Sequence, residues 1–323
     1  MDIITYNMSM QKQKILIVIG PTASGKSDLA VNTALELFKN ENKESVIISA
    51  DSRQVYKYLN VGSGKITEIE MQSVPHFGLG IVEPEEKFTV ADWVKYAEDK
   101  IKEAAEQNKL PIICGGTGLY VDSLLYGLQD NPAPDYEQRK LLENKTLSEL
   151  QEMLKIKNQE YFESLNNSER NNSARLIRKL ELENYIINNT EENKINTRPP
   201  LYDAEFIILK PDLKKLENKI KIRLQNRLGL IEASPLIKEI DGLINFIKDE
   251  EGLKEIKEER KQKRIVWLLS LGLEYTYVTE YILGQINLEE MKASIILRSL
   301  QYAKRQITWN KRYEEMENVK VLR

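Results

Sequence analysis

The first part of the chain alternates short apolar runs with longer segments of helical periodicity. Residues 14–19, 45–49 and 110–114 are short runs rich in isoleucine, valine and leucine. In segments such as 27–40 and 119–128, apolar residues instead recur every three or four positions. Buried strands that alternate with amphipathic helices predict a parallel α/β sheet with helices packed on it.

The remaining segments divide the chain further. Residues 74–82 predict another strand, and residues 89–107 predict an amphipathic helix. From about 139 to 197 charged and amide residues dominate at helical spacing, which predicts a small all-helical insertion. A strand is expected at 202–209, and from Pro211 onward we expect helices only. The predicted segments are a P-loop NTPase-like α/β core in 1–138, a helical insertion in 139–199, and a return to the core with a helical C-terminal region in 200–323.

A glycine-rich loop joins the first predicted strand to the first predicted helix. It reads Gly20-Pro21-Thr22-Ala23-Ser24-Gly25-Lys26-Ser27 and fits the pattern G-x-x-x-x-G-K-[ST]. Glycines permit the tight turn that points successive N–H groups into one concavity, and the helix adds the positive end of its dipole. Lys26 would reach phosphate oxygens, and the Ser27 hydroxyl would bind Mg²⁺. The loop predicts a phosphate or diphosphate site; the alternative is a chance glycine-rich turn.

Two further loops follow predicted strands. One begins with Asp51, and the other, residues 115–118, contains Thr117. Ligands of open α/β sheets bind beyond the carboxyl ends of the strands, so we expect Asp51 and Thr117 beside the phosphate held by Lys26. The alternatives are an N-cap or metal-ligand role for Asp51 and an N-cap role for Thr117.

Composition excludes several classes of protein. The chain has 323 residues, a net charge of −3, one cysteine and one histidine. One cysteine excludes a disulfide framework and a zinc ribbon, and one histidine excludes a His-rich metal site. No signal-peptide pattern is present and residues 14–19 are too short to cross a bilayer, so we expect a soluble, cytoplasmic protein without a membrane partner. We also expect a monomer. Cys114 is expected to be a small core residue, and His76 a packed, hydrogen-bonded one.

Local basic stretches stand out against this small net charge. Residues 291–313 contain six basic residues and no acidic one. On a helix, Ile296, Leu300, Ala303 and Ile307 would share the face that packs on the core, and Arg298, Arg305 and Arg312 the opposite face. Such a face favours nucleic acid over an ordinary solvated surface. A second pair, Arg175 and Arg178, lies one helical turn apart, and a solvated face is equally compatible with it.

Six separated segments carry distinctive runs of residues: 20–27, 51–56, 74–76, 115–120, 175–181 and 303–309. In this order they resemble the tRNA dimethylallyltransferases (tRNA isopentenyltransferases), and the likeness extends from about residue 15 to residue 313. Many families share a phosphate loop. The segments Asp-Ser-x-Gln-Val-Tyr and Ala-Lys-Arg-Gln-x-Thr-Trp are much more specific.

The resemblance implies transfer of a dimethylallyl group from dimethylallyl diphosphate to N6 of the adenosine just 3′ of the anticodon in tRNA. It implies Asp51 as general base, with Thr117 and Lys26 also catalytic. The diphosphate ligands that it implies are Gly20, Thr22, Ala23, Ser24, Gly25, Lys26, Ser27 and Arg223, with Mg²⁺ on Ser27. The expected tRNA contacts are Asp51, Ser52, Arg53, Gln54, Thr117, Arg139, Ala174, Arg175, Leu176, Ile177 and Arg178, to which the basic helix adds Arg298 and Arg305.

The chain departs from the family pattern at two places. His76 is followed by Phe77, where the family often has a second histidine, and residues 165–172 replace an Asp-Pro and His-Pro-Asn-Asp run. Three other functions compete with the resemblance. A small-molecule kinase would use the phosphate loop for ATP, an adenylate isopentenyltransferase would modify a free nucleotide, and an RNA-binding protein would need no general base. The basic helix argues against the first two, and Asp51 against the third.

Overall fold

The computed structural model describes residues 12–128, 136–188, 199–249 and 252–323. The chain forms two compact units. One consists of Met1–Leu125 together with Pro200–Arg323, and the other is Tyr126–Pro199. The first unit therefore combines the beginning and the end of the chain, and the central segment forms the second unit.

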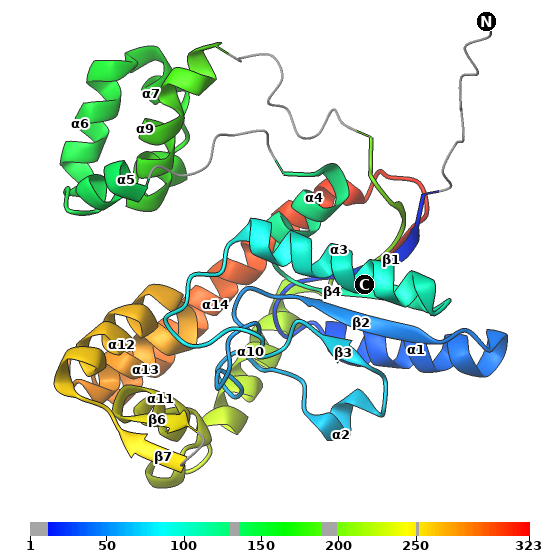
Figure 1. Ribbon diagram of the computed structural model, residues 1–323. Coiled ribbons are helices and arrows are strands. Elements are labelled where there is room, and N and C mark those ends of the chain that lie inside the picture. Colours follow the sequence, from blue (N-terminus) through cyan, green and yellow to red (C-terminus); the bar gives the residue numbers. More distant parts are fainter. Residues whose placement is uncertain (1–11, 129–135, 189–198, 250–251) are drawn as a thin grey trace, which may run out of the picture. The chain divides into compact units, whose positions relative to one another are not determined.

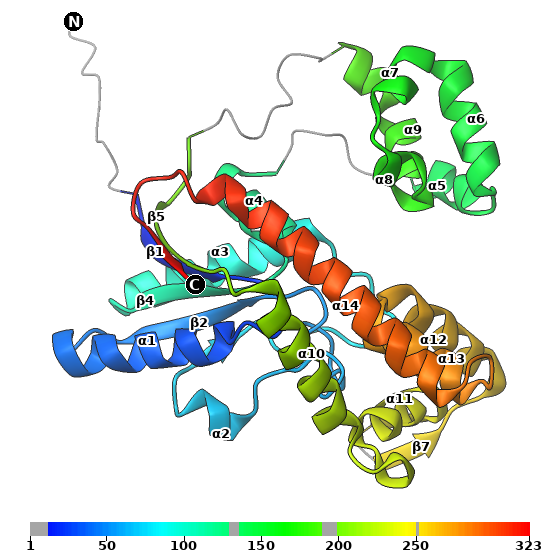
Figure 2. The same ribbon diagram turned by 180° about the vertical axis from the view of Figure 1, so that it is seen from behind.

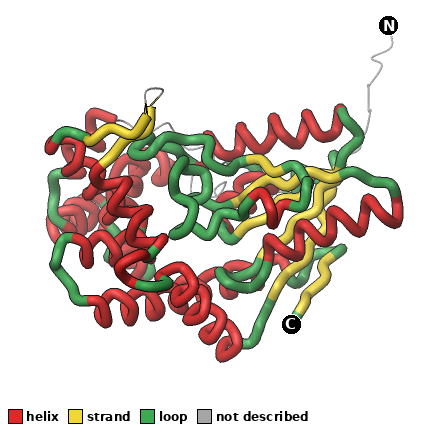
Figure 3. Tube along the Cα trace, turned by 90° about the horizontal axis from the view of Figure 1, so that it is seen from below, coloured by secondary structure: helices red, strands yellow, loops and turns green. Residues whose placement is uncertain are grey.

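A six-stranded sheet, whose strands are among the yellow segments of Figure 3, forms the centre of the first unit. Its strand order is β3-β2-β4-β1-β5-β8. Its strands are β1 (Lys14–Ile19), β2 (Ser45–Ala50), β3 (His76–Phe77), β4 (Leu110–Gly115), β5 (Asp203–Leu209) and β8 (Val319–Leu322). All neighbouring strands run parallel, which confirms the predicted α/β sheet. The loops after β1, β2 and β4 therefore leave the sheet at one edge.

Helices cover both faces of this sheet (Figure 1). α1 (Lys26–Glu41) buries Ala30, Val31 and Ala34 against the face that carries Leu16 and Val18 of β1. The alternate side chains of β1 face the other side, as the two-residue period of a strand requires. There α3 (Val90–Glu106) and α4 (Gly118–Tyr126) pack through Trp93 and Tyr120, whose rings stack 4.5 Å apart.

Helices dominate the C-terminal part of the first unit. They are α10 (Leu213–Leu228), α11 (Pro235–Asn245), α12 (Glu258–Leu271), α13 (Leu273–Ile282) and α14 (Leu288–Asn310). The short α2 (Glu68–Met71) lies between β2 and β3 in the sequence. Asn287 and Glu290 form a capping box that begins α14. α14 lies beside α10 and α13 (Figure 2). Its Gln306 is hydrogen-bonded to the loops after β1 and β4.

The expectation that only helices follow Pro211 is wrong. β6 (Phe246–Asp249) and β7 (Gly252–Glu255) form an antiparallel hairpin, and β8 extends the main sheet. Four-residue strands are too short for hydrophobic periodicity to identify, and β8 forms because β5 offers an unpaired edge. The predicted strand 74–82 is also shorter than expected, since Gly78 and Gly80 adopt positive φ angles of 79° and 62° and interrupt it.

The second unit is all helical in the residues that the structure describes, as predicted for the insertion. It contains α5 (Tyr136–Glu143), α6 (Leu147–Lys157), α7 (Gln159–Ser164), α8 (Asn167–Arg170) and α9 (Ser173–Asn188). Its core includes Leu150, Leu154, Phe162 and Leu176. The run that departs from the family pattern forms α8, which Asn166 and Glu169 begin with a capping box.

No helix among the described residues is long and apolar enough to cross a membrane.

At Gly115, near the end of β4, the backbones of β4 and β2 approach each other closely. A Cβ atom on Gly115 would overlap the Ala50 carbonyl oxygen, which belongs to the backbone and has no room to yield. We expect Gly115→Ala to lower the free energy of unfolding by about 1–3 kcal/mol, which is about 2–4 °C of Tm per kcal/mol in a unit of this size. Thermal denaturation followed by circular dichroism would measure this.

Gly242→Ala is the matched control. Gly242 lies within α11, and no atom lies within 4 Å of the position of an added Cβ. Alanine in a helix interior is favoured over glycine by about 0.5–1 kcal/mol, so this variant should be slightly more stable. Equal Tm values for the two variants would contradict the close approach of β4 and β2.

Candidate active site

The phosphate loop occupies the centre of the sheet edge, because β1 lies between β4 and β5. Ala23 and Gly25 adopt left-handed conformations, with φ angles of 59° and 93°, and α1 begins directly afterward at Lys26. The first N–H groups of a helix have no partner within the helix. The Ser24 hydroxyl is buried and has no hydrogen-bond partner among the described residues. These unsatisfied donors make the loop suited to an anion.

Two partly buried cations, Lys26 of the loop and Arg223 of α10, lie at this site. The Lys26 ammonium donates to the Pro21 carbonyl oxygen at 2.9 Å, and burial is the main cause that lowers the pKa of Lys26. Burial, and then the charge of Arg227, lowers the pKa of Arg223 to about 10. Arg223 also lowers the pKa of Lys26, so the two cations are close enough to repel each other. A bound polyanion would offset both the cost of burying these two charges and the repulsion between them.

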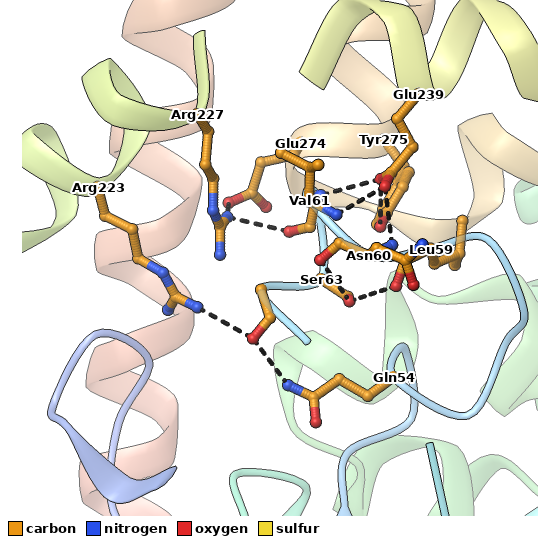
Figure 4. A network of polar contacts seen from close by, with 12 residues as sticks. Gln54, Leu59, Asn60, Val61, Ser63, Arg223, Arg227, Glu239, Glu274 and Tyr275 are labelled. Atoms are coloured by element: carbon orange, nitrogen blue, oxygen red, sulfur yellow. Dashed lines mark hydrogen bonds and ion pairs between the residues drawn. The ribbon is translucent and has the colours of Figure 1, made fainter. Parts of the chain in front are cut away.

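Arg223 belongs to a network that holds the loop 60–64 (Figure 4). It donates to the Gly64 carbonyl oxygen at 3.5 Å, whereas its neighbour Arg227 forms an ion pair with Glu274 at 2.7 Å. Among the described residues, no ion pair neutralises Arg223. The site therefore retains an uncompensated positive charge one helical turn from a paired arginine.

Glu239 holds the same loop from the other side (Figure 4). Its carboxylate accepts hydrogen bonds from the backbone N–H groups of Asn60, Val61 and Gly62, at 2.8, 2.6 and 3.0 Å. The hydroxyl of Tyr275 donates to the same carboxylate at 3.3 Å. Sequence reasoning missed this role, and its one local signal was the glycine-containing stretch 61–65.

Asp51 and Thr117 lie in two loops that are hydrogen-bonded to each other. The Thr117 hydroxyl accepts from Ser52 N–H at 3.1 Å, and Thr117 N–H donates to the Ala50 carbonyl oxygen at 3.1 Å. Oδ1 of Asp51 accepts from the N–H groups of Arg53 and Gln54 at 2.8 and 3.3 Å. The Asp51 charge raises the pKa of Lys26, as expected for neighbours. The structure thus brings Asp51, Thr117 and Lys26 together.

The hydrogen bonds of Asp51 bear on the alternatives left open by the sequence. Oδ1 does cap the turn at residues 53–54, in the manner of an Asx turn. Both hydrogen bonds described for this carboxylate end on Oδ1, which fixes its orientation; no hydrogen bond to Oδ2 is found among the described residues. Thr117 uses its hydroxyl across the two loops, which accounts for its position without an N-cap role.

Arg53 and Gln54 also anchor this loop. Arg53 Nε donates to the Leu271 carbonyl oxygen at 2.8 Å. Gln54 accepts from the Ser49 hydroxyl at 3.0 Å and donates to the Gly64 carbonyl oxygen at 3.2 Å. The Asp51 loop is therefore joined to β2, to the end of α12 and to the loop that Arg223 contacts.

The buried face of α14 differs from the predicted one. Leu300, Ala303 and Ile307 pack near α10, as expected. The buried positions of the helix, however, are half apolar and half polar: Met291, Ile295 and Ala303, and Ser299, Gln306 and Asn310. Gln306 and the partly buried Tyr302 and Trp309 contact the loops of the site, and sequence reasoning missed this. Their i, i+4, i+7 spacing was the available signal.

The predicted arginine face of α14 is confirmed only in part. Arg298 and Arg305 are exposed; Arg298 donates to the Tyr277 hydroxyl at 3.0 Å, and Arg305 lies over the Tyr302 ring. Arg312 was wrongly placed on this face. It follows the end of α14, forms an ion pair with Asp122 at 2.7 Å and lies over the Trp309 ring at 4.2 Å. The buried Asp122 carboxylate, which also accepts from the Tyr313 hydroxyl, needs this cation.

The candidate tRNA contacts of the second unit have different environments. Arg139 makes a bidentate ion pair with Glu181, with both contacts at 2.7 Å, and Arg178 reaches the same carboxylate at 3.0 Å. Leu176 and Ile177 are 0% and 5% exposed, so their side chains belong to the core of this unit. Two exposed positions are Ala174 and Arg175.

The lone histidine and the lone cysteine behave as predicted. Nδ1 of His76 lies 2.8 Å from the Val74 carbonyl oxygen, and burial lowers the pKa of His76. Cys114 is buried near the end of β4, and burial raises the pKa of its thiol to about 11. A thiol with a raised pKa is a poor nucleophile, which favours the structural role.

Comparisons with known proteins agree with this geometry. A model of the IPP transferase family matches residues 54–313, and a model of the isopentenyl transferase family matches residues 13–79. A tRNA dimethylallyltransferase of Caldanaerobacter subterraneus subsp. tengcongensis is 35% identical over 312 residues, which cover 93% of this chain and 90% of the relative. One of Bacillus anthracis is 33% identical over 308 residues, which cover 93% of this chain and 88% of the relative.

Solved structures give the same result. A tRNA delta(2)-isopentenylpyrophosphate transferase from Staphylococcus epidermidis superposes with a TM-score of 0.63 at 30% identity, over 96% of this chain and 93% of that one. A eukaryotic dimethylallyltransferase acting on tRNA shares the fold, with a TM-score of 0.67 at 20% identity over 96% of this chain and 73% of that one. Because a family model spans most of the sequence and relatives match nearly its whole length, this chain belongs to the IPP transferase family of prenyltransferase enzymes.

Proposed function

We propose that this chain transfers a dimethylallyl group from dimethylallyl diphosphate to N6 of the adenosine just 3′ of the anticodon in tRNA. The observation that carries the proposal is a carboxylate, Asp51, on the loop beside two partly buried cations, Lys26 and Arg223. A base for an amine and a cationic pocket for a diphosphate leaving group are what this transfer needs. The similarity to a tRNA dimethylallyltransferase and to a tRNA isopentenylpyrophosphate transferase supports tRNA as the acceptor.

The site residues have distinct roles in the proposed reaction. The exocyclic nitrogen of adenine attacks the allylic carbon, a C–N bond forms, and the C–O bond to diphosphate breaks. Oδ2 of Asp51 takes the proton that the nitrogen loses. The loop N–H groups, Lys26 and Arg223 stabilise the charge that grows on the departing diphosphate. The Thr117 hydroxyl and the Ser52 N–H keep the Asp51 loop in place.

The donor set fits Mg²⁺ bound chiefly through the substrate. Among the described residues, no cluster of three histidine, cysteine, aspartate or glutamate side chains exists to hold a metal by itself. Mg²⁺ commonly takes few protein ligands and binds through phosphate oxygens and water. Ser27, in the first turn of α1, would supply the hydroxyl ligand. The ion would add positive charge beside the leaving group.

The proposal assigns the tRNA contacts according to the environment of each side chain. Arg298 and Arg305 on α14 and the exposed Ala174 and Arg175 on α9 would meet the tRNA directly. Arg139 and Arg178 would bind it while sharing Glu181, and Leu176 and Ile177 could contribute only backbone groups. Ser52, Arg53, Gln54 and Thr117 would contact the flipped base or shape its pocket.

An incubation with labelled dimethylallyl diphosphate tests the acceptor. Unmodified tRNA and AMP would be offered in parallel, and we expect label on the tRNA alone. Label on AMP alone would make the chain an adenylate isopentenyltransferase, and phosphoryl transfer from ATP to a small molecule would make it a kinase. Size-exclusion chromatography would test the expected monomer, and a tRNA acceptor also favours the expected cytoplasmic location.

The exposed arginines of α14 give a prediction about tRNA affinity. Replacing Arg298 and Arg305 together with glutamine should weaken tRNA binding. It should also lower the salt dependence of binding by about one unit of slope for each phosphate group that the variant no longer neutralises. Titration of labelled tRNA at several salt concentrations would measure both effects.

Lys39→Gln combined with Lys102→Gln is the matched control. Both lysines are exposed and lie near the C-terminal ends of α1 and α3, at the opposite edge of the sheet from the phosphate loop. This control removes the same charge and should leave the salt slope unchanged. An equal loss in both double variants would mean that net charge, not the arginine face, governs tRNA affinity.

A further inference from the structure

We propose that Gln306 is a positioning residue of the diphosphate site, because its side-chain amide fastens the phosphate loop to the loop that carries Thr117. The proposal rests on the function proposed above. Gln306 projects from α14, 284 positions along the chain from Thr22. It has no charge and no place in the bond-making steps.

Both ends of the Gln306 amide bond to backbone groups. Oε1 accepts from Thr22 N–H at 2.7 Å, and Nε2 donates to the Gly116 carbonyl oxygen at 2.9 Å. The side chain is 6% exposed. Glutamine is suited to this position because one end of its amide accepts and the other donates. A buried amide without these bonds would be costly, so the contacts fix both loops relative to α14.

The bond to Thr22 affects the part of the loop that would grip diphosphate. Thr22 is followed by Ala23 and, two positions later, by Gly25. The left-handed conformations of these two residues turn the loop toward the start of α1. Glycine-rich segments lose much conformational freedom when they order. An anchor at Thr22 therefore orders the loop before the ligand arrives, and preorganised donors bind developing charge more strongly.

Two glycines make room for this anchor. A Cβ atom on Gly116 would overlap Nε2 of Gln306, and a Cβ atom on Gly118 would overlap the Trp309 ring. Thr117 lies between these glycines. The Tyr302 hydroxyl, one helical turn before Gln306, lies beside Thr117; burial and, to a lesser degree, the Asp51 charge raise the pKa of Tyr302 to about 12. One face of α14 therefore supports the diphosphate loop and the Thr117 loop together.

The test compares Gln306→Met with the wild-type protein. Methionine keeps the length and burial of the side chain but makes neither hydrogen bond. We expect the Kd for magnesium diphosphate, measured by calorimetry, to rise about tenfold. The Kd for tRNA should stay within about twofold of the wild-type value, since the exposed arginines are untouched. Gln262→Met on α12 is the control: Gln262 is exposed and donates to Glu258, so this variant should change neither Kd.

A second variant guards against loss of folding. Gln306→Glu keeps the size and the acceptor for Thr22 N–H, but places a carboxylate oxygen against the Gly116 carbonyl oxygen and a negative charge near the diphosphate. It should weaken diphosphate binding at least as much as methionine does. If Gln306→Met lowers Tm more than Gln262→Met does, diphosphate binding by Gln306→Glu decides whether Gln306 is a positioning residue.

The outcomes separate this inference from the proposed function. Wild-type protein that binds magnesium diphosphate, with unchanged binding in both Gln306 variants, overturns the positioning role alone. Parallel loss of diphosphate and tRNA binding in both variants also overturns it, because a general structural role would then suffice. Wild-type protein that does not bind magnesium diphosphate overturns the proposed function, and the inference with it.

Discussion

Asp51→Asn is expected to reduce prenyl transfer by a factor of about 10²–10⁴, the usual contribution of a general base. Asparagine keeps the Oδ1 acceptor for the N–H groups of Arg53 and Gln54, so the loop should retain its conformation. The exchange removes only the capacity of the second oxygen to take a proton. Single-turnover transfer from labelled dimethylallyl diphosphate to tRNA would measure the loss, with binding of both substrates measured alongside.

Asp51→Ala separates the chemistry from the loop. Alanine removes both the base and the acceptor for two backbone N–H groups, so we expect the same loss of transfer together with a lower Tm. Asp51→Asn should keep the wild-type Tm. If the asparagine variant transfers at the wild-type rate, the base is another group. If it loses binding of both substrates as well, Asp51 is structural.

Lys26→Met is expected to lower the rate of transfer by about 10²–10³, comparable with the removal of one preorganised donor to a developing charge. Methionine keeps an unbranched side chain but carries no charge. Arg223 and the loop N–H groups remain, so weakened diphosphate binding rather than its complete loss is expected. Calorimetry with magnesium diphosphate and single-turnover transfer would give the two effects separately.

The exposed Lys39, in the last turn of the same helix, supplies the control for Lys26. Lys39→Met removes the same charge at the far end of α1 and should leave diphosphate binding and transfer unchanged. An undiminished rate in Lys26→Met would mean that the loop amides and Arg223 suffice to stabilise the leaving group. The pKa of Lys26 is lowered chiefly by burial, so removal of the charge also removes a desolvation cost from the free protein.

The order of strands and helices could be predicted because it is encoded locally. Side-chain periodicity distinguishes a strand from a helix within a few residues, and β1, β2, β4, β5, α1 and α3 match the predicted segments closely. The phosphate loop could also be recognised locally, since its motif lies within residues 20–27. The meeting of Asp51, Thr117 and Lys26 followed from one general rule, that parallel strands end at the same edge of their sheet.

The sequence failed where a residue depends on a distant partner. β8 is a strand because β5 lacks a neighbour on that side, and four residues of hydrophobic pattern do not reveal this. Arg312 continues the arginine spacing of the helix, yet a buried carboxylate 190 positions away holds it. Glu239 and Gln306 look like ordinary polar residues of helices, although each is tied to backbone groups of a site loop.

The sequence by itself thus determined the phosphate loop, the α/β architecture and, through resemblance, the family. Only the tertiary structure decided which polar side chains hold the loops in place and that Arg312 pairs with a buried carboxylate. The physical reason is that periodicity and turn geometry act between near neighbours in the chain. Buried polar groups, by contrast, take whatever partner the packing of distant helices brings to them. The phosphate loop illustrates both kinds of interaction. Its own glycines permit its turn, whereas its anchor, Gln306, lies near the end of the chain.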